Sequence, residues 1–431
     1  MIIAKGKQYD SAIQNELLDH LEREINETLT SKTLSMETVI GALDILSHRI
    51  AAGEFDERIA RLPMEGAEQY KQLAVTLLSR AHVEFKIRTE LSENSRLSYV
   101  TEPPYDLPKL RVKAMPLGVL LHIAAGNADG LPAYSLAEGM LTGNVNILKL
   151  PQADNGLSVE IIMTLIDIEP SLADFIYVFD TPSTDVAAIQ RMAELSDGIV
   201  VWGGDMAVSA VRKFAPLGAR IIEWGHKLSF AYISGYEDKE RELNALAEHI
   251  MSTKQLLCSS CQTIFIDTEQ MEDVYVFCRE FLPYLEQAAY AHQSHTIGGV
   301  AEITLRKYTE RLESIFKKTD GDTNQQFKGT LCSLTPCTDS NLELSGMFGN
   351  CLVKRLPEKE LLKVLRRKKN YLQTAGLICS VDQREHLTEL LLRSGVVRIT
   401  GAGNMSASFA GEAHDGEYPL QRYLRIVNEE I

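Results

Sequence analysis

The chain has 431 residues, of which 45% are hydrophobic and 24% charged, and its formal net charge is −15 at pH 7. This length allows two or three domains with buried cores. The acidic balance disfavours nucleic acid and anionic membranes as main partners, because a phosphate surface requires a basic counterpart. We therefore expect no nucleic-acid or membrane partner, although a local basic pocket for a phosphorylated ligand is compatible with this balance.

The amino terminus and the cysteines indicate the compartment. Residues 1–4 run directly into charged sequence without an apolar core or a cleavage site, so no signal peptide is predicted. The most apolar run, residues 118–125, is too short to span a bilayer. The odd number of cysteines, 7, fits free thiols in a reducing compartment. We predict a cytoplasmic protein.

In chain order, residues 10–95 have helical periodicity and no catalytic motif. Prolines then interrupt the helical pattern, and residues 97–100 and 110–112 alternate as strands do. From residue 116 onward, helical stretches separate short apolar runs that we predict to be strands, at 118–123, 144–150, 175–179, 199–202 and 220–223. Strands that alternate with helices of this length indicate an α/β fold with a parallel sheet and right-handed crossovers.

Ligands of such sheets bind at the carboxyl ends of the strands. In this sequence the predicted strands end in small or polar residues, at Gly126-Asn127, Lys149, Asp180, Gly203-Gly204 and Glu223. These positions mark the expected ligand edge of the first unit.

A second unit is predicted to begin near residue 227. Its expected elements are strands at 229–233, 263–266 and 376–380, helices at 238–254 and 269–292, and a basic amphipathic helix at 360–369. No internal repeat or low-complexity linker is present, so the two units are expected to pack closely.

Cys258 is the strongest candidate for chemistry. It lies where a helical pattern gives way to a strand, and a cysteine at such a junction can be exposed and close to backbone N–H groups that stabilise its thiolate. A thiolate attacks carbonyl carbon and is also a good leaving group. An inert buried thiol is the ordinary alternative. Cys261 leaves a redox dithiol or a zinc site open, but no second cysteine or histidine pair has ligand spacing, so no metal is predicted.

The usual dinucleotide fingerprint is absent. Gly401-Ala402-Gly403 lacks a third glycine and has no room for a following βαβ unit. Gly203-Gly204 is a better place for backbone to approach a ligand, although a plain tight turn explains it nearly as well. Lys149 is either a ribose or phosphate ligand or simply solvated. Glu223 is either a general base with raised basicity or a paired carboxylate.

Several sequence blocks, taken together and in order, resemble the aldehyde dehydrogenase superfamily. They more closely resemble its acyl-CoA reductase branch, typified by the fatty-acid reductase subunit of bacterial luminescence systems. The blocks are His-Ile-Ala-Ala-Gly-Asn at 122–127, Val-Trp-Gly-Gly-Asp at 201–205, Lys-Leu-Ser-Phe at 227–230, Cys-Ser-Ser at 258–260, Tyr-Leu-Gln-Thr-Ala-Gly at 371–376, Ala-His-Asp-Gly at 413–416 and Pro-Leu-Gln-Arg at 419–422. The match runs from about residue 116 to the carboxyl terminus.

The resemblance implies an aldehyde-dehydrogenase-like fold: a five-stranded Rossmann-type cofactor domain, an α/β catalytic domain and a small β oligomerisation extension. The helical lead-in and cofactor domain would span residues 1–226, with the extension at about 97–113. The catalytic domain would span 227–394. Residues 395–431 would return to the cofactor and oligomerisation unit, and a homo-oligomer is expected.

The resemblance also implies residue roles. Cys258 matches the acylated nucleophile, and the side-chain amide of Asn127 would form the oxyanion hole with the N–H of Cys258. Lys149 lies at the strand end that touches the adenosine ribose. Trp202, with the two glycines that follow it, matches the turn against the pyrophosphate of the cofactor.

The implied reaction is the NAD(P)H-dependent reduction of an acyl-CoA, or another acyl thioester, to an aldehyde through an acyl-cysteine. Gln152 stands where NAD-preferring members often have a glutamate. An amide would not repel a 2′-phosphate, so NADPH is the expected cofactor and NADH the alternative. The acyl donor remains open between CoA, a carrier protein and an acyl-transferase or synthetase partner. The basic run 363–369 is either a site for the phosphates of a coenzyme or a solvated helix face. Its part at 366–369 could instead guide an acidic carrier protein.

Two alternatives remain. Glu223 stands at the position of the carboxylate that activates water in hydrolytic aldehyde dehydrogenases, so a CoA-independent aldehyde dehydrogenase is the first. The second is a non-catalytic scaffold subunit that keeps the fold only for assembly.

Overall fold

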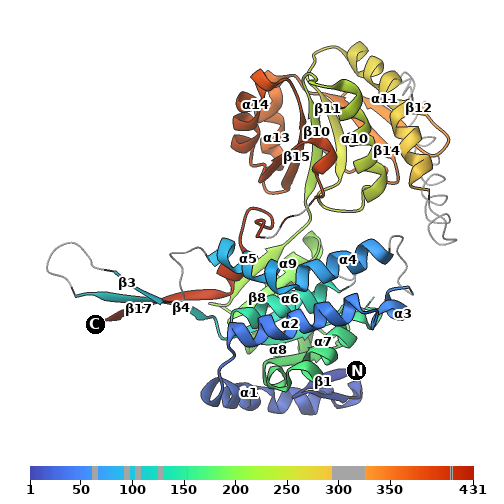
Figure 1. Cartoon of the computed structure of the whole chain (residues 1–431). Helices are drawn as coiled ribbons and strands as arrows, with labels where there is room; N and C mark the ends of the chain where they lie inside the picture. Colours follow the sequence, from blue (N-terminus) through green and yellow to red (C-terminus); the bar gives the residue numbers. More distant parts are fainter. Residues whose placement is uncertain are drawn as a thin grey trace. The chain divides into compact units, whose positions relative to one another are not determined.

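The computed structural model describes residues 1–60, 67–91, 98–101, 108–124, 130–152, 154–293, 326–407, 409 and 411–431. The chain folds into two compact units (Figure 1). Unit 1 comprises Met1–Gly225 together with Phe409–Ile431, and unit 2 comprises His226–Ser408.

A seven-stranded sheet, in the order β2-β1-β7-β6-β5-β8-β9, forms the centre of unit 1. Five of its strands run parallel: β5 (Val119–Ile123), β6 (Val145–Lys149), β7 (Ile176–Phe179), β8 (Gly198–Trp202) and β9 (Arg220–Trp224). β6 and β7 are buried along their whole length, as expected for a parallel sheet covered on both faces. The predicted parallel α/β sheet is confirmed.

The expectation of five strands is wrong, because an amino-terminal hairpin adds two more. β1 (Ile2–Ala4) pairs antiparallel with β7, and β2 (Lys7–Tyr9) pairs with β1. The two-residue turn between them has positive φ at Lys5 (50°) and Gly6 (74°), which matches the twist of a tight hairpin. Strands of three residues are too short to show a periodicity in the sequence.

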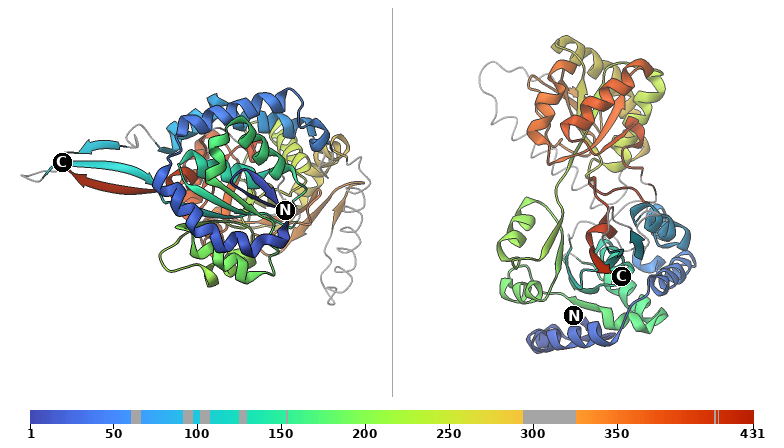
Figure 2. Two further views of the ribbon diagram at one scale, coloured as in Figure 1. Left: turned by 90° about the horizontal axis from the view of Figure 1, so that it is seen from below. Right: turned by 90° about the vertical axis from the view of Figure 1, so that its left-hand side faces the viewer.

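Helices cover both faces of this sheet (Figure 2). One face packs against α2 (Met36–Ala51), α6 (Leu131–Leu141) and α7 (Leu157–Ile168). The other packs against α1 (Gln14–Ser31), α8 (Val186–Glu194) and α9 (Asp205–Phe214). The remaining helices of this unit are α3 (Asp56–Ile59), α4 (Ala67–Leu78), α5 (Arg80–Leu91) and α15 (Pro419–Arg422).

A three-stranded antiparallel sheet extends from unit 1 (Figure 1). It contains β3 (Ser98–Thr101), β4 (Leu110–Pro116) and β17 (Leu424–Glu430), with β4 in the middle. The carboxyl tail therefore joins the β extension, as the resemblance implied. A role of this sheet in oligomerisation stays a prediction.

Unit 2 contains a second seven-stranded sheet, in the order β12-β13-β14-β11-β10-β15-β16. The strands are β10 (Leu228–Ile233), β11 (Cys261–Ile266), β12 (Phe327–Lys328), β13 (Ser333–Cys337), β14 (Asn350–Arg355), β15 (Leu372–Ile378) and β16 (Arg398–Thr400). One face packs against α10 (Lys239–Thr253) and α11 (Met271–Ala291), and the other against α13 (Glu358–Leu365) and α14 (Val381–Ser394). No helix in the described ranges is long and apolar enough to cross a membrane.

The predicted boundary between residues 394 and 395 is corrected by the structure. β16 lies beyond that boundary but pairs with β15, with Ala375 opposite Ile399. The short helix Ala402–Asn404 packs against Gly376 so closely that a Cβ there would lie 2.9 Å from the Cα of Ala402. The chain therefore returns to unit 1 only at Phe409, because the sheet of unit 2 includes β16 as one more strand.

Candidate active site

Cys258 lies in the turn between α10 and β11, and its side chain is exposed. Five other cysteines are buried, and Cys337 is half-buried. Burial raises the pKa of the Cys261 thiol to about 12, which keeps that thiol protonated at neutral pH. The redox-dithiol interpretation therefore loses support, and no metal-binding cluster is found among the described residues. Cys258 is the accessible thiol of the described chain.

An unusual backbone turn brings Cys258 to the surface. α10 ends at Thr253, and the next two residues, Lys254 and Gln255, have φ values of 49° and 60°. Non-glycine residues are uncommon in this left-handed region and adopt it only where the surroundings hold them there. Here the N–H of Phe348 donates to the carbonyl oxygen of Lys254 at 2.9 Å.

The buried side chain of Gln255 stabilises this turn. Its amide nitrogen donates to the carbonyl oxygen of Cys261 at 2.9 Å, and its amide oxygen accepts from the N–H of Gly349 at 3.1 Å. The side chain of Gln262 donates in turn to the carbonyl oxygen of Gln255 at 2.8 Å. One glutamine thus joins both ends of the turn to the loop before β14.

Three further side chains hold the backbone on either side of Cys258. The hydroxyl of Ser229 donates to the carbonyl oxygen of Cys258 at 2.7 Å, and the hydroxyl oxygen of Ser260 accepts from the N–H of Leu257 at 3.1 Å. The N–H of Cys261 donates to Nε2 of His249 at 3.3 Å. Burial, aided by the charge of Arg398, lowers the pKa of His249 to about 4, so the ring is neutral and can accept this bond. The backbone is thus held while the Cys258 side chain stays exposed.

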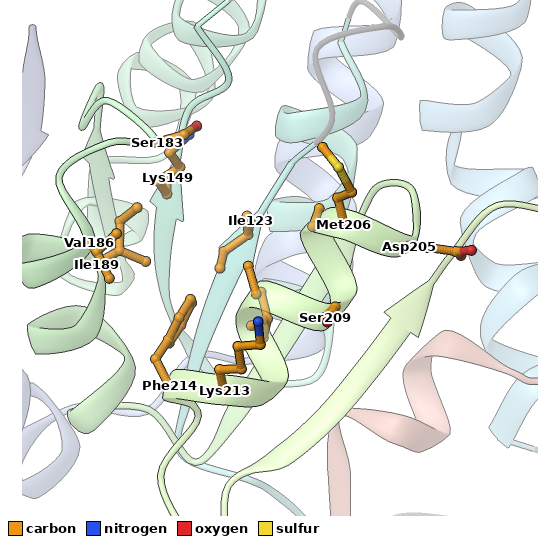
Figure 3. Close-up of a pocket in the computed structure, with 13 residues that line it drawn as sticks. Ile123, Lys149, Ser183, Val186, Ile189, Asp205, Met206, Ser209, Lys213 and Phe214 are labelled. Atoms are coloured by element: carbon orange, nitrogen blue, oxygen red, sulfur yellow. The ribbon is translucent and has the colours of Figure 1, made fainter.

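In unit 1, a pocket of about 910 Å³ lies at the carboxyl ends of β5 and β6 (Figure 3). Lys149, the last residue of β6, is buried in its wall and donates to the hydroxyl of Ser183 at 3.1 Å. Burial lowers the pKa of Lys149. Lys213 and Phe214 of α9 also line the pocket. The interpretation of Lys149 as a solvated surface lysine is therefore wrong.

The turn from β8 into α9 leaves backbone open to a ligand. A Cβ on Gly203 would lie 2.9 Å from the Cβ of Ala207, whereas a Cβ on Gly204 would meet nothing within 4 Å. Gly204 caps the 10-residue helix α9, and the free N–H groups of a helix amino terminus favour phosphate. With Lys149 in the adjacent wall, these features fit a phosphorylated dinucleotide.

Trp202 turns away from this pocket. Its indole nitrogen donates to the hydroxyl of Ser135 at 3.0 Å, and its ring lies 5.2 Å from that of His414. Both rings line a second, apolar cavity of about 340 Å³. The cavity lies among α2, α4, α6 and α7, and its walls include Leu43, Leu46, Ala74, Ala137 and Leu165. No motif in the sequence marks this cavity, because its residues also form an ordinary helix core.

The remaining predicted residues have different surroundings. Glu223 on β9 forms a bidentate ion pair with Arg212 of α9, with Oε2 and Nη2 2.7 Å apart, which matches the paired-carboxylate alternative. A general-base role for Glu223 stays a prediction. Gln152 is exposed in the turn after β6 and does not line the Lys149 pocket. Asn127 lies outside the described residues.

Sequence reasoning missed Ser183 and the side chains that hold residues 254–260, which we call the nucleophile turn after the proposed role of Cys258. Ser183 lies just before α8, but Asp185 caps that helix by accepting from the N–H of Ala188, so no capping signal points to Ser183. Gln255 lies three residues before Cys258, between Lys254 and Leu256, and no pattern in the sequence marks it as a buried side chain. His249 looked like an ordinary helix position.

Fold and site together define the class, an aldehyde-dehydrogenase-like fold with an exposed cysteine in the turn before β11. Among solved structures, glyceraldehyde-3-phosphate dehydrogenase GapN from Methanocaldococcus jannaschii, complexed with NADP, superimposes with a TM-score of 0.68 at 14% identity over 99% of this chain and 95% of that one. A putative methylmalonate-semialdehyde dehydrogenase from Sinorhizobium meliloti, complexed with NAD, gives 0.67 at 16% identity over 97% and 87%. At these identities the likeness establishes the fold alone.

The chain belongs to the acyl-CoA reductase (LuxC) family, whose family model matches residues 32–426. A long-chain acyl-protein thioester reductase from Vibrio harveyi is 24% identical over 425 residues, which cover 95% of this chain and 86% of that protein. A protein of the same name from Aliivibrio fischeri is 27% identical over 334 residues, covering 74% and 65%. The predicted family and the predicted enzyme class, an aldehyde-forming oxidoreductase, are confirmed.

Proposed function

We propose that this chain reduces a long-chain acyl thioester to the aldehyde and that Cys258 carries the acyl group. One observation carries the assignment of Cys258: its thiol is exposed on a turn whose backbone is otherwise held by buried side chains. A nucleophile needs access to the carbonyl carbon, and a held backbone keeps it in the geometry of attack. The names of the curated relatives support a thioester substrate.

The chemistry proceeds on the sulfur of Cys258. Its thiolate attacks the thioester carbonyl, a new C–S bond forms and the thiolate of the donor leaves. A nicotinamide cofactor, when bound, supplies the hydride that reduces the acyl-cysteine. The hemithioacetal on Cys258 then collapses, its C–S bond breaks, and the aldehyde leaves as the thiolate is restored. The N–H of Cys258 and the side chain of Asn127 are proposed to stabilise the oxyanion.

The cofactor is proposed to be NADPH, bound in the Lys149 pocket. Lys149 and Lys213 give this pocket two cations, and Ser183 adds a hydroxyl. The open backbone at Gly204 supports a place for the pyrophosphate. The exposed amide at Gln152, in place of a carboxylate, leaves no charge there to repel a 2′-phosphate.

The acyl chain is proposed to bind in the apolar cavity of unit 1. No acidic residue, lysine or arginine among the described residues lines this cavity, and burying one methylene contributes about 0.8 kcal/mol. Trp202 is the last residue of β8, as Lys149 is of β6, and these strands run parallel. The part of the cavity lined by Trp202 and His414 therefore lies at the same sheet edge as the Lys149 pocket.

Aldehyde formation from tetradecanoyl-CoA and NADPH tests the proposed function. Cys258→Ala is expected to lose at least about 1000-fold in kcat/KM, since no other described thiol is exposed. Cys337→Ala, which removes the half-buried thiol of the same unit, is the matched control and should retain activity. Full activity in Cys258→Ala would refute the assignment, and absence of aldehyde from any acyl thioester would refute the function.

A further inference from the structure

A basic segment of unit 2 has no part in the proposed chemistry. The segment begins on α13, whose Leu361, Val364 and Leu365 are buried, and continues into a single 3₁₀ turn at Arg366–Lys368. We call this segment the basic edge, and its exposed cations are Lys363, Arg366, Arg367 and Lys369.

The basic edge concentrates positive charge at the carboxyl end of α13. Within the part of the chain that the structure describes, no carboxylate forms an ion pair with these four cations. Lys363, Arg366 and Arg367 have the spacing i, i+3 and i+4, which places neighbouring side chains on one side of a helix. Elsewhere in unit 2, the exposed Lys359 pairs with Glu269 and Arg393 with Glu389.

The basic edge lies at the same edge of the sheet as Cys258. β11 and β15 both run parallel to β10, on its two sides, with Ser229 opposite Cys261 and Leu228 opposite Leu372. The amino ends of β11 and β15 are therefore level with each other. Cys258 precedes Cys261 in the turn before β11, and Lys369 precedes Leu372 in the turn before β15.

Only β10 separates the two turns. Neighbouring strands lie about 4.8 Å apart, so β11 and β15 are roughly 10 Å apart. The hydroxyl of Ser229 connects them, because it donates to the carbonyl oxygen of Cys258 at 2.7 Å and accepts from the N–H of Thr374 at 3.1 Å. A partner bound at the basic edge would thus hold its acyl group close to the nucleophile turn.

We propose that the basic edge is the docking surface for an acidic protein that delivers the acyl group as a thioester. The inference rests on the proposed function. The four cations are exposed on a helix end, which suits the surface of another protein, whereas small-molecule sites are concave. The curated relatives are named acyl-protein thioester reductases, which supports a protein as donor.

The overall charge of the chain makes such a local surface necessary. A net charge of −15 repels an acidic protein at long range. A complementary patch next to the nucleophile raises the rate of productive encounter and fixes the orientation of the partner. Salt screens this attraction, with a Debye length of about 8 Å at physiological ionic strength.

The test compares three donors of the same tetradecanoyl group with the full chain: acyl-pantetheine, acyl-CoA and an acylated acyl carrier protein as the acidic probe. The double variant Arg366→Glu/Arg367→Glu is expected to lower kcat/KM for the carrier protein by about 10- to 100-fold at low salt. Activity with acyl-pantetheine, which is uncharged, should stay within twofold, and the loss should shrink as salt is added.

Single variants supply a matched charge control. Arg367→Glu is compared with Arg384→Glu, which reverses an exposed cation in the first turn of α14, beyond the carboxyl end of β15. Only Arg367→Glu should affect the carrier protein. Binding of a fluorescently labelled carrier protein is followed separately by anisotropy. If no aldehyde forms with any donor, the proposed function fails, but this binding measurement still tests the basic edge.

Three outcomes would overturn the proposal. A loss confined to acyl-CoA would make the basic edge a phosphate site. An equal loss with all three donors would mean that the substitutions disturb the nucleophile turn. Unchanged catalysis and unchanged carrier binding in the double variant would show that the basic edge is only a solvated helix face.

Discussion

The nucleophile turn of unit 2 and the Lys149 pocket of unit 1 are built in opposite ways. Around Cys258, the side chains of Gln255, Ser229, Ser260 and His249 each hydrogen-bond to backbone. Around the 910 Å³ pocket, one side-chain hydrogen bond joins Lys149 to Ser183, and most other lining residues are apolar. Side chains thus hold the backbone of the nucleophile turn at several points, whereas the pocket leaves space for a ligand.

The difference follows from the roles that we propose for the two regions. The covalent step needs a thiol that keeps its place, because a misplacement of 1 Å can cost about 100-fold in rate. A cofactor that enters and leaves in every turnover instead needs a preformed space with a few polar contacts. Substitutions in the turn should therefore affect stability and chemistry together, whereas substitutions in the pocket should affect binding alone.

Gln255→Leu should give the largest effect, because it removes the amide that joins both ends of the nucleophile turn. The N–H of Gly349 and the carbonyl of Cys261 would lose their partner, at a cost of about 1–3 kcal/mol each. We expect a lower melting temperature and a fall of about 100-fold in kcat. The KM for NADPH should not change.

Gln8→Leu, at an exposed glutamine of β2, is the control. A Gln255→Leu enzyme with full kcat would show that the turn needs no such support. A rise in KM for NADPH alone would place the effect in the other region.

Lowering the pH should weaken the turn through His249. Its pKa is about 4 in the folded chain and about 6.5 when unfolded, so below pH 6.5 the unfolded state binds a proton that the folded state does not. Stability present above pH 6.5 is lost as the pH falls toward 4. The loss at pH 5 is about 2 kcal/mol, or roughly 30-fold in the folding equilibrium.

Denaturant unfolding at pH 7.5 and 5.0 measures this term. His249→Gln cannot titrate, so its stability should fall less between the two pH values than that of the wild type. Equal falls would mean that His249 does not couple the turn to pH.

Lys149→Met should affect the pocket without weakening the fold. Methionine fills the same space without a buried ammonium group, so stability should be unchanged or higher. The loss of one charged hydrogen bond should raise the KM for NADPH about tenfold. Acylation of Cys258 without cofactor should proceed at the normal rate. Lys7→Met, at an exposed lysine of β2, is the control. Slower acylation of Cys258 in Lys149→Met would contradict the separation of the pocket from the nucleophile turn.

Ala74→Phe should give the smallest effect, a change in chain-length preference. The added ring would occupy part of the apolar cavity, and each methylene displaced costs about 0.8 kcal/mol, roughly fourfold in kcat/KM. The preferred acyl chain should become shorter, as measured over a series of acyl-CoAs. Ala81→Phe, at an exposed position of α5, should leave the preference unchanged. An unaltered profile in Ala74→Phe would remove this cavity from the acyl site.

The sequence allowed the parallel strands and the position of Cys258 to be predicted, because apolar runs and a helix-to-strand junction are local signals. It did not reveal β1 and β2, whose pairing with β7 depends on a distant strand. It also did not show the left-handed turn at Lys254 and Gln255, since contacts from the loop before β14 impose it. The strands and the candidate nucleophile could be predicted from neighbouring residues in the sequence. The side chains that support the nucleophile turn could not, because they come from residues far apart in the chain.

Peptide mapping of the acyl-enzyme tests the central claim most directly. The full chain is incubated with tetradecanoyl-CoA without cofactor, digested and analysed by mass spectrometry, and a second sample receives NADPH before digestion. We predict one acyl group on the peptide that contains Cys258, and its loss as tetradecanal when NADPH is added. An acyl group on any other residue, or one on Cys258 that NADPH does not release, would contradict the account.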